Sequence, residues 1–183
     1  MSAGKRSDSE DAGHAFVGVY AAQLPRLRRI VAGMGFGPSD ADDILQDVYL
    51  EASQKPGEYR GPEAAEHWLL RATVNRCLLE YRRRRRFRRA ASEIVSGQAS
   101  DTIVTPGDAE AGALRLEEID AVRSALRELD GPSAAILALR YFCELDATRI
   151  GAILDLPPAT VRGRLRAARL RLAEELTKRG LTK

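Results

Sequence analysis

The chain has 183 residues, of which 44% are hydrophobic and 30% charged, so it can form one or two small domains with modest cores. Its net charge is only +3, although residues 82–89 contain seven arginines and residues 158–172 contain five, which leaves the remainder net negative. Two basic blocks on an otherwise acidic chain indicate a polyanionic partner, and the lack of a long apolar run argues against membrane insertion.

Helical periodicity runs through nearly every ordered stretch of the sequence, without strand alternation, which predicts an all-α fold. The first helix is expected over 11–32, with Pro25 causing a kink or a local break. Ser39 or Asp40 is expected to cap the second helix, and the third, over 63–89, is expected to be packed on two sides through its first half. The buried stripe of the second helix is predicted to be Ile44, Leu45, Val48 and Ala52.

The composition changes after the third helix. Residues 93–120 contain seven acids and one arginine, with three glycines and one proline. We therefore expect a flexible acidic linker at 93–112 between two small helical domains, 11–92 and 113–183, with residues 1–10 forming a disordered tail. The four helices predicted for the second domain are at about 113–129, 132–143, 146–154 and 158–178.

The segment 146–172 has the pattern of a helix-turn-helix unit. Asp146 is expected to cap a short helix, Asp155 to occupy a left-handed turn position, and Pro157 and Pro158 to open the second helix. The predicted buried face of that second helix is Val161, Leu165, Ala168 and Leu172. The opposite face has small residues, which allow close approach of the backbone, and flanking arginines, which can reach phosphates or guanine edges. This arrangement predicts a helix that reads a DNA groove.

Patterns for catalysis or metal binding are not found in the sequence. Cys77 and Cys143 stand alone without a CxxC motif, the histidines are His14 and His67, and no nucleophile set or phosphate loop has sensible spacing. The cysteines are expected to be buried small hydrophobic residues. We therefore expect no enzyme activity, no cofactor and no metal. The N-terminal stretch lacks an apolar signal core, which predicts a cytoplasmic protein.

Three segments, in family order and spacing, resemble bacterial sigma factors of the sigma-70 family, in the extracytoplasmic-function (ECF, group IV) class. "DADDILQDVYLEA", at 40–52, resembles the pattern "DAEDLVQETFLKA", and "YRGPEAAEHWLLRATVNRCLLEYRRRRR", at 59–86, resembles "FRG…WLYRIARNLCIDYLRRRRR". The segment 125–172 resembles "AL..LP…LRY.EGLSYEEIAEILGIS.GTVKSRLHRARKRL". The resemblance implies a region 2 bundle at 11–92 and a region 4 helix-turn-helix domain at 113–183.

The resemblance also implies a function and partners. Such a protein binds core RNA polymerase, directs it to specific promoters and assists DNA melting, without chemistry of its own. By similarity, Asp43, Gln46 and Asp47 would face the coiled coil of the polymerase β′ subunit, and the β flap is a further implied polymerase contact. An anti-sigma factor is a further candidate partner, because members of this class are commonly held inactive by one.

Contacts to the minus-ten promoter element are implied for the third helix and the loop before it. Tyr59, Arg60 and Gly61 match a loop that captures an unpaired base, for which an aromatic ring and a guanidinium plane are suited. Trp68 and Asn75 match neighbouring positions, although a lone tryptophan is more often a core residue. The arginine run is interpreted as a clamp on the DNA backbone, and its members assigned to minus-ten DNA are Arg82, Arg83 and Arg86.

Contacts to the minus-thirty-five element are implied for the last helix. The matching positions are Thr160, Arg162, Gly163, Arg164 and Arg166. Two residues depart from the family pattern, because Ala167 replaces a usual arginine and Pro157 a common serine cap, so base preference cannot be copied from relatives. A stand-alone helix-turn-helix regulator is the alternative. It would more typically carry a ligand-binding or dimerising domain than an acidic helix followed by an arginine run.

Overall fold

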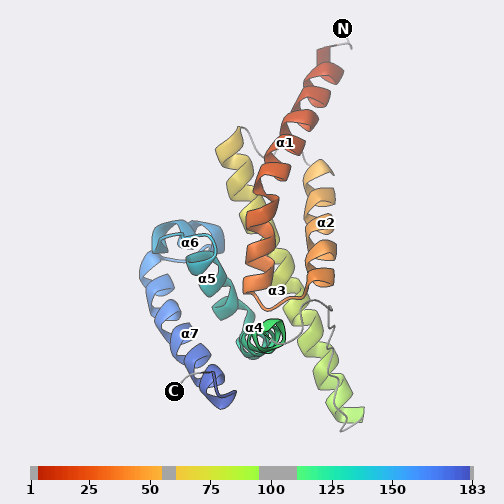
Figure 1. The fold of residues 1–183 in the computed structure, drawn as a ribbon. Helices are drawn as coiled ribbons and strands as arrows, with labels where there is room; N and C mark the ends of the chain where they lie inside the picture. The colour runs from red at the N-terminus through yellow and green to blue at the C-terminus, as the bar shows by residue number, and fades with distance from the viewer. Residues whose placement is uncertain (1–3, 55–60, 95–110, 182–183) are drawn as a thin grey trace.

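The computed structural model describes residues 4–54, 61–94 and 111–181, and within these ranges the chain is helical without strands, as predicted. The helices are α1 (Gly4–Gly33), α2 (Pro38–Gln54), α3 (Pro62–Ile94), α4 (Ala111–Glu128), α5 (Gly131–Tyr141), α6 (Ala147–Leu154) and α7 (Pro158–Lys178). Figure 1 shows α1, α2 and α3 side by side as one group, with α4 to α7 as a second group against it. None of the described helices is long and apolar enough to cross a membrane.

Helices α1, α2 and α3 pack against one another as a three-helix bundle. The predicted stripe of α2 is confirmed, since Ile44, Leu45, Val48 and Ala52 are all buried. The bundle is also joined by a hydrogen bond of 2.8 Å, which the Tyr20 hydroxyl donates to the Leu45 carbonyl oxygen. Trp68 is half-buried against the core, but Leu79 is 47% exposed, so the second packed side of α3 ends before that residue.

The first two helices begin at other residues than the sequence predicts. Helix α1 begins at Gly4, within the expected tail, and runs through Pro25 without a break. Helix α2 begins at Pro38, because Gly37 accepts the first helical hydrogen bond and its own N–H donates to the Asp40 carboxylate. Asp40 therefore lies within the first turn of α2, where its carboxylate accepts the N–H of the residue before the helix, as in a capping box. It is not itself the N-cap residue. The acidic linker lies mostly in 95–110, outside the described residues.

The helix-turn-helix unit forms as the sequence predicts. Asp146 caps α6 by accepting hydrogen bonds from the N–H groups of Thr148 and Arg149, at 2.9 and 2.8 Å. Asp155 ends the helix in the left-handed conformation, with φ of 56°. Pro157 stands at the start of α7 without a side-chain cap. The α7 stripe is confirmed, since Val161 and Ala168 are buried and Leu165 and Leu172 pack against the core.

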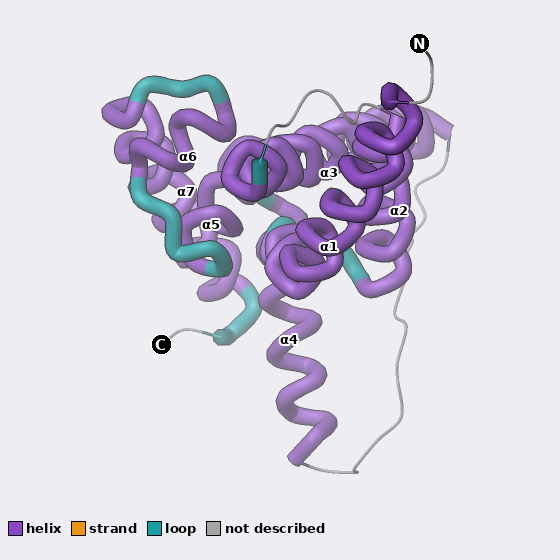
Figure 2. The backbone as a smooth tube through the Cα atoms, turned by 90° about the horizontal axis from the view of Figure 1, so that it is seen from above, coloured by secondary structure: helices purple, strands orange, loops and turns teal. Residues whose placement is uncertain are grey.

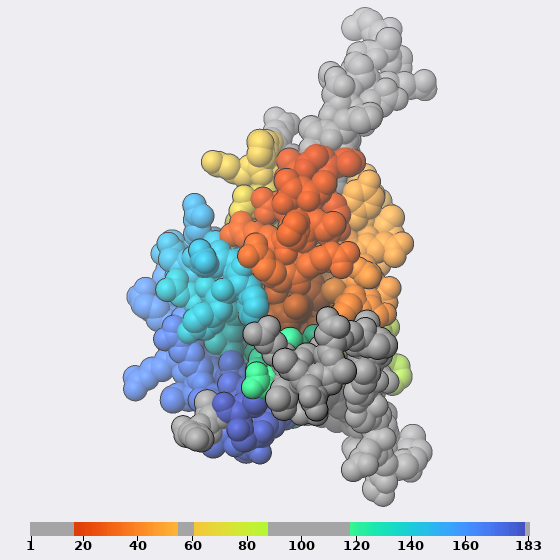
Figure 3. Space-filling view, viewed as in Figure 1, coloured from red at the N-terminus to blue at the C-terminus, as the bar shows by residue number. Residues whose placement is uncertain are grey.

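The two groups of helices are in direct contact. Helix α5 packs against α1 and α3, and α6 packs against α3, so the buried side chains of both groups form one continuous core. Seen from above, α5 lies between the first bundle and the pair α6–α7 (Figure 2). In the space-filling view, the surface of α1 abuts the surface of the second group (Figure 3). The sequence did not predict this contact.

Candidate functional site

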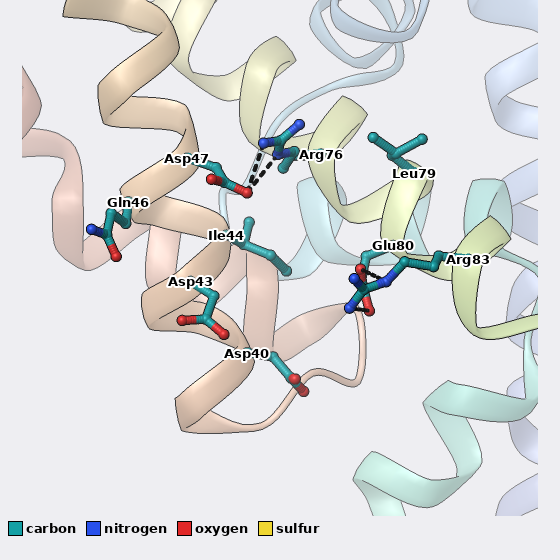
Figure 4. A pocket seen from close by; sticks show the side chains of 9 residues that line it. All are labelled: Asp40, Asp43, Ile44, Gln46, Asp47, Arg76, Leu79, Glu80 and Arg83. Carbon is teal, nitrogen blue, oxygen red and sulfur yellow. Dashed lines mark hydrogen bonds and ion pairs between the residues drawn. The ribbon is translucent and has the colours of Figure 1, made fainter. Parts of the chain in front are cut away.

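Three surfaces contain the residues that the sequence singles out. The first lies on α2, where Asp43 and Gln46 are exposed and Asp47 is half-buried. Asp47 forms an ion pair with Arg76 of α3, with 2.7 Å between its Oδ2 and Arg76 Nη2 (Figure 4). The three predicted residues therefore lie together on one face, but one carboxylate is already paired within the protein.

The same face includes part of α3. A groove of about 450 Å³ runs between the two helices (Figure 4), lined by Asp40, Asp43, Ile44, Gln46, Asp47, Arg76, Leu79, Glu80 and Arg83. Leu79 is a large apolar side chain left 47% exposed in this mostly charged groove. That α3 contributes to this face was not predicted from the sequence. A signal for the exposure of Leu79 was available in the sequence, because this residue lies only three residues before the arginine run begins at Arg82.

The second surface lies near the start of α3. A hollow of about 490 Å³ is lined by Glu51, Ala64, His67, Trp68, Arg71, Ala72 and Asn75. The structure therefore brings the predicted residues Trp68 and Asn75 to one hollow. Gly61 directly precedes α3 with φ of 87°, a conformation that favours glycine. Tyr59 and Arg60 lie outside the described residues.

The arginine run divides into two kinds of residue. Arg82, Arg85 and Arg86 are exposed. Arg84 is instead half-buried, where it pairs with Asp40 and Glu80 and lies 5.0 Å from the centre of the Phe36 ring. These contacts fasten α3 to the start of α2, so Arg84 belongs to the structure of the bundle and not to the free basic surface.

Arg83, a residue assigned to minus-ten DNA, also has a partner within α3. Its Nε lies 2.9 Å from Glu80 Oε2, but its side chain remains 68% exposed. An exposed pair of this kind contributes little to stability, so the guanidinium can leave it for a phosphate at small cost. The exposed arginines Arg82 and Arg86 therefore remain the stronger members of the predicted clamp.

The third surface is the outer face of α7. Arg162, Gly163, Arg164 and Arg166 are exposed, and Thr160 is half-buried. None of the three arginines forms an ion pair with another residue that the structure describes.

The other two arginines of α7 have partners in the second group of helices, although both side chains are exposed. Arg169 lies 5.4 Å from the centre of the Tyr141 ring, and Arg171 forms an ion pair of 2.8 Å with Asp130, the N-cap of α5. The arginines without such a partner among the described residues, Arg162, Arg164 and Arg166, therefore lie in the first half of α7.

Comparison with known proteins identifies the family. Residues 19–87 match the family model described as Sigma-70 region 2, and residues 119–172 match Sigma-70, region 4. The ECF RNA polymerase sigma factor SigM of Mycobacterium tuberculosis is 33% identical over 157 residues, which are 84% of this chain and 71% of that protein. The chain belongs to the ECF class of sigma-70 family sigma factors. RNA polymerase sigma factor CnrH of Cupriavidus metallidurans is 29% identical over 154 residues, 80% of this chain and 78% of that protein.

Solved structures confirm the fold of this sigma factor. CnrH in complex with the cytosolic domain of CnrY superposes with a TM-score of 0.60 at 21% identity, over 93% of this chain and 95% of that one. Sigma factor RpoE, in complex with the anti-sigma factor NepR from Bartonella quintana, gives 0.62 at 20% identity, over 86% and 93%. The region 2 match also decides against a stand-alone helix-turn-helix regulator, since α1, α2 and α3 belong to the sigma fold.

Proposed function

We infer that this sigma factor binds core RNA polymerase and directs it to specific promoters for transcription initiation. The observation that carries this function is the placement of an acidic α2 face and a basic α7 face on one chain, within matches to regions 2 and 4 in family order. An acidic face suits a basic or amide-rich protein surface, whereas exposed arginines suit the DNA backbone and guanine edges.

Each surface then has its own proposed role. The groove between α2 and α3 would receive the polymerase β′ coiled coil, with Asp43 and Gln46 as polar contacts and Leu79 as an apolar anchor. An apolar centre surrounded by a polar rim is typical of protein interfaces. Asp47 would act partly through Arg76, because the ion pair fixes the rotamers of both side chains at the edge of the groove.

The hollow on α3 would receive a base of the minus-ten element that Tyr59, Arg60 and Gly61 help to capture. Trp68 supplies an aromatic surface there, and Asn75 supplies an amide that can donate to and accept from a base edge. The exposed arginines Arg82 and Arg86 would then follow the DNA backbone. The first half of α7 would read the minus-thirty-five element.

An anti-sigma factor is proposed as a further partner. RpoE, one of the structural neighbours, was solved with an anti-sigma factor bound. Since core polymerase and promoter DNA are cytoplasmic in bacteria, we place the action of this chain there. Besides binding, the protein would assist the melting of promoter DNA. This step needs no catalytic group of the sigma factor itself.

Reconstituted transcription tests the proposed function. Purified protein is added to core polymerase on promoters found by mapping transcription starts after overexpression of the protein. We expect initiation that requires both components, and start sites that share two upstream motifs. Core polymerase without the protein is the control. Initiation that is absent on every mapped promoter, or that does not depend on this chain, would contradict the function.

A further inference from the structure

The outermost line of α7 is apolar, although the helix as a whole is strongly basic. Gly163, Ala167 and Leu170 are spaced by four and three residues, so they lie on one face of the helix. All three are exposed, and Leu170 keeps 60% of its surface accessible. This line, here called the apolar pole, lies on the side of α7 away from the buried Val161 and Ala168. It is therefore the part of α7 that projects farthest from the protein, along one outer edge of the molecule (Figure 1).

Exposed arginines flank the apolar pole on both sides. Helical period places Arg162 and Arg166 about 90° to one side of it, and Arg164 about 90° to the other. An α-helix is about 10–12 Å wide, which matches the width of about 12 Å of the major groove of B-DNA. When the pole points to the floor of the groove, the long arginine side chains lie against the phosphates of its two walls. The pole is then left to meet the base edges.

The short side chains at the pole allow the backbone of α7 to come close to those edges. A Cβ atom on Gly163 would have nothing within 4 Å, so no packing contact within the described protein requires glycine there. Ala167 stands where the family pattern has an arginine, and its side chain is a single methyl group. A long side chain at this position would hold the helix away from the bases, whereas glycine and alanine permit a close approach.

The chemistry of the pole suits one base edge in particular. In the major groove guanine presents two acceptors, N7 and O6, which arginine or lysine typically reads, whereas thymine presents its C5 methyl group. Neither Ala167 nor Leu170 has a side-chain donor, so a guanine covered by them would lose its hydrogen bonds to water without replacement. A thymine methyl group would instead be buried favourably against their methyl groups.

We propose that Ala167 and Leu170 select thymine in the minus-thirty-five element, through contact of their methyl groups with the C5 methyl groups of the bases. This inference rests on the proposed function, which assigns the first half of α7, ending near Ala167, to that element. The two residues are about 4.5 Å apart along the helix axis, close to the base-pair step of about 3.4 Å, so they would contact neighbouring base pairs. The flanking arginines remain available for phosphates and for other base pairs.

Deoxyuridine substitution tests the proposal, because uracil has hydrogen in place of the thymine methyl group and is otherwise the same base. Each thymine of a mapped minus-thirty-five element is replaced in turn, and binding of the holoenzyme is measured by competition at fixed salt. Loss of one buried methyl contact should weaken binding about fourfold at the selected positions. Deoxyuridine between the two promoter elements is the matched control and should have no effect. Unchanged affinity at every replaced thymine, or an element without thymine on either strand, would overturn the proposal while the sigma function stands.

Variants at the pole show which residue makes each contact. In Ala167→Gly the effect of deoxyuridine should disappear at one position, and in Leu170→Ala it should weaken at a neighbouring position. Both residues are exposed, so neither change removes a side chain from the core. If the full deoxyuridine effects persist in both variants, other residues contact the methyl groups, and the proposal fails.

Ala167→Arg gives the converse test, because a guanidinium group at this position can pair with guanine N7 and O6. Promoters are selected by the holoenzyme from a library with a randomised minus-thirty-five element. We expect the wild-type protein to enrich thymine at one position and Ala167→Arg to enrich guanine there by about tenfold. Gly18→Arg is the charge control, since it adds the same side chain to α1 at an exposed position with nothing within 4 Å, and it should select as the wild type does. Guanine enriched by the wild type, or the same base enriched by wild type and Ala167→Arg, would overturn the proposal.

Discussion

The backbone N–H of Leu156 donates a hydrogen bond of 2.9 Å to the carbonyl oxygen of Gly151, which closes the turn between α6 and α7. A Cβ atom on Gly151 would lie 2.4 Å from the carbonyl oxygen of Leu156, a backbone atom that cannot swing aside. We therefore expect Gly151→Ala to lower the free energy of unfolding by about 3 kcal/mol, the upper part of the usual range for overpacking. Urea denaturation, monitored by circular dichroism, measures this change in the free energy of unfolding.

Gly163→Ala is the control for that experiment. Gly163 is exposed on α7 with nothing within 4 Å of an added Cβ, so alanine should raise the free energy of unfolding by about 0.5–1 kcal/mol through helix propensity. Equal destabilisation by Gly151→Ala and Gly163→Ala would show that the turn has no special need for glycine.

Two acidic residues hold the left-handed conformation in the helix-turn-helix domain, Glu144 with φ of 57° and Asp155 with φ of 56°. Glycine adopts this conformation without steric cost, but it also gains freedom in the unfolded chain. We expect Glu144→Gly to raise the free energy of unfolding by about 0.5–1 kcal/mol, and Asp155→Gly by less, because aspartate tolerates this region better. Glu144→Ala keeps the strain and removes the charge. If it stabilises as much as glycine, electrostatics and not backbone strain is the cause.

Charge reversal on α2 separates a polymerase contact from a general electrostatic effect. Asp43 is exposed in the groove, whereas Asp42 pairs with Arg28 of α1 at 2.7 Å. We expect Asp43→Lys to weaken binding to core polymerase on the order of tenfold, or about 1.4 kcal/mol, and Asp42→Lys to weaken it much less. Titration of labelled protein with core polymerase gives both affinities at one salt concentration. Equal weakening by the two variants would mean that total charge, not the groove, governs binding.

Local features of this fold could be predicted from the sequence because they depend on neighbours in the chain. The cap at Asp146, the left-handed Asp155 and the buried stripe of α7 all follow from residues within two or three helical turns. The contact between the two groups of helices could not be predicted, because Gly33 and Gly131 have the same local pattern as ordinary helix ends. Their role appears only when a helix distant in sequence comes within van der Waals contact.

In the candidate sites, too, features set by neighbouring residues could be predicted, and contacts between residues distant in sequence could not. The predicted residues of α2 and of the first half of α7 do lie on common exposed faces, since helical period fixes which positions share a face. Pairing across helices could not be inferred. Asp47 meets Arg76, and Arg84 meets Asp40, over 29 and 44 residues of sequence. A run of like charges gives no local signal of which member turns inward.

The arginine run allows a prediction, because the Arg84 side chain packs against the bundle while those of its neighbours are exposed. Arg85 and Arg86 are exposed, so replacing both by alanine should lower the slope of log affinity against log salt by about 0.9 for each phosphate that the protein no longer neutralises. Arg84→Ala should leave the slope unchanged but lower the free energy of unfolding by about 1 kcal/mol, because alanine cannot pair with Asp40 or stack on Phe36. Promoter binding by the holoenzyme at several salt concentrations gives the slopes. A lower slope for Arg84→Ala would show that this residue, too, reaches DNA.

The arginines of α7 test whether this helix recognises the bases of the minus-thirty-five element. Arg162 and Arg166 are exposed on the half of the helix that is free to enter a groove, whereas Arg171 is paired with Asp130. If Arg162 or Arg166 contacts a base, its replacement by alanine should cost about 1–3 kcal/mol of discrimination between the cognate promoter and one with a scrambled minus-thirty-five element. Arg171→Ala is the matched control, and it should leave the discrimination unchanged because Arg171 lies in the second half of α7, beside Asp130 of the α5 N-cap. Competition binding of the holoenzyme at fixed salt measures the ratio. If Arg162→Ala weakens binding to both promoters equally, that arginine contacts phosphate, and the groove-reading role passes to its neighbours on the same face.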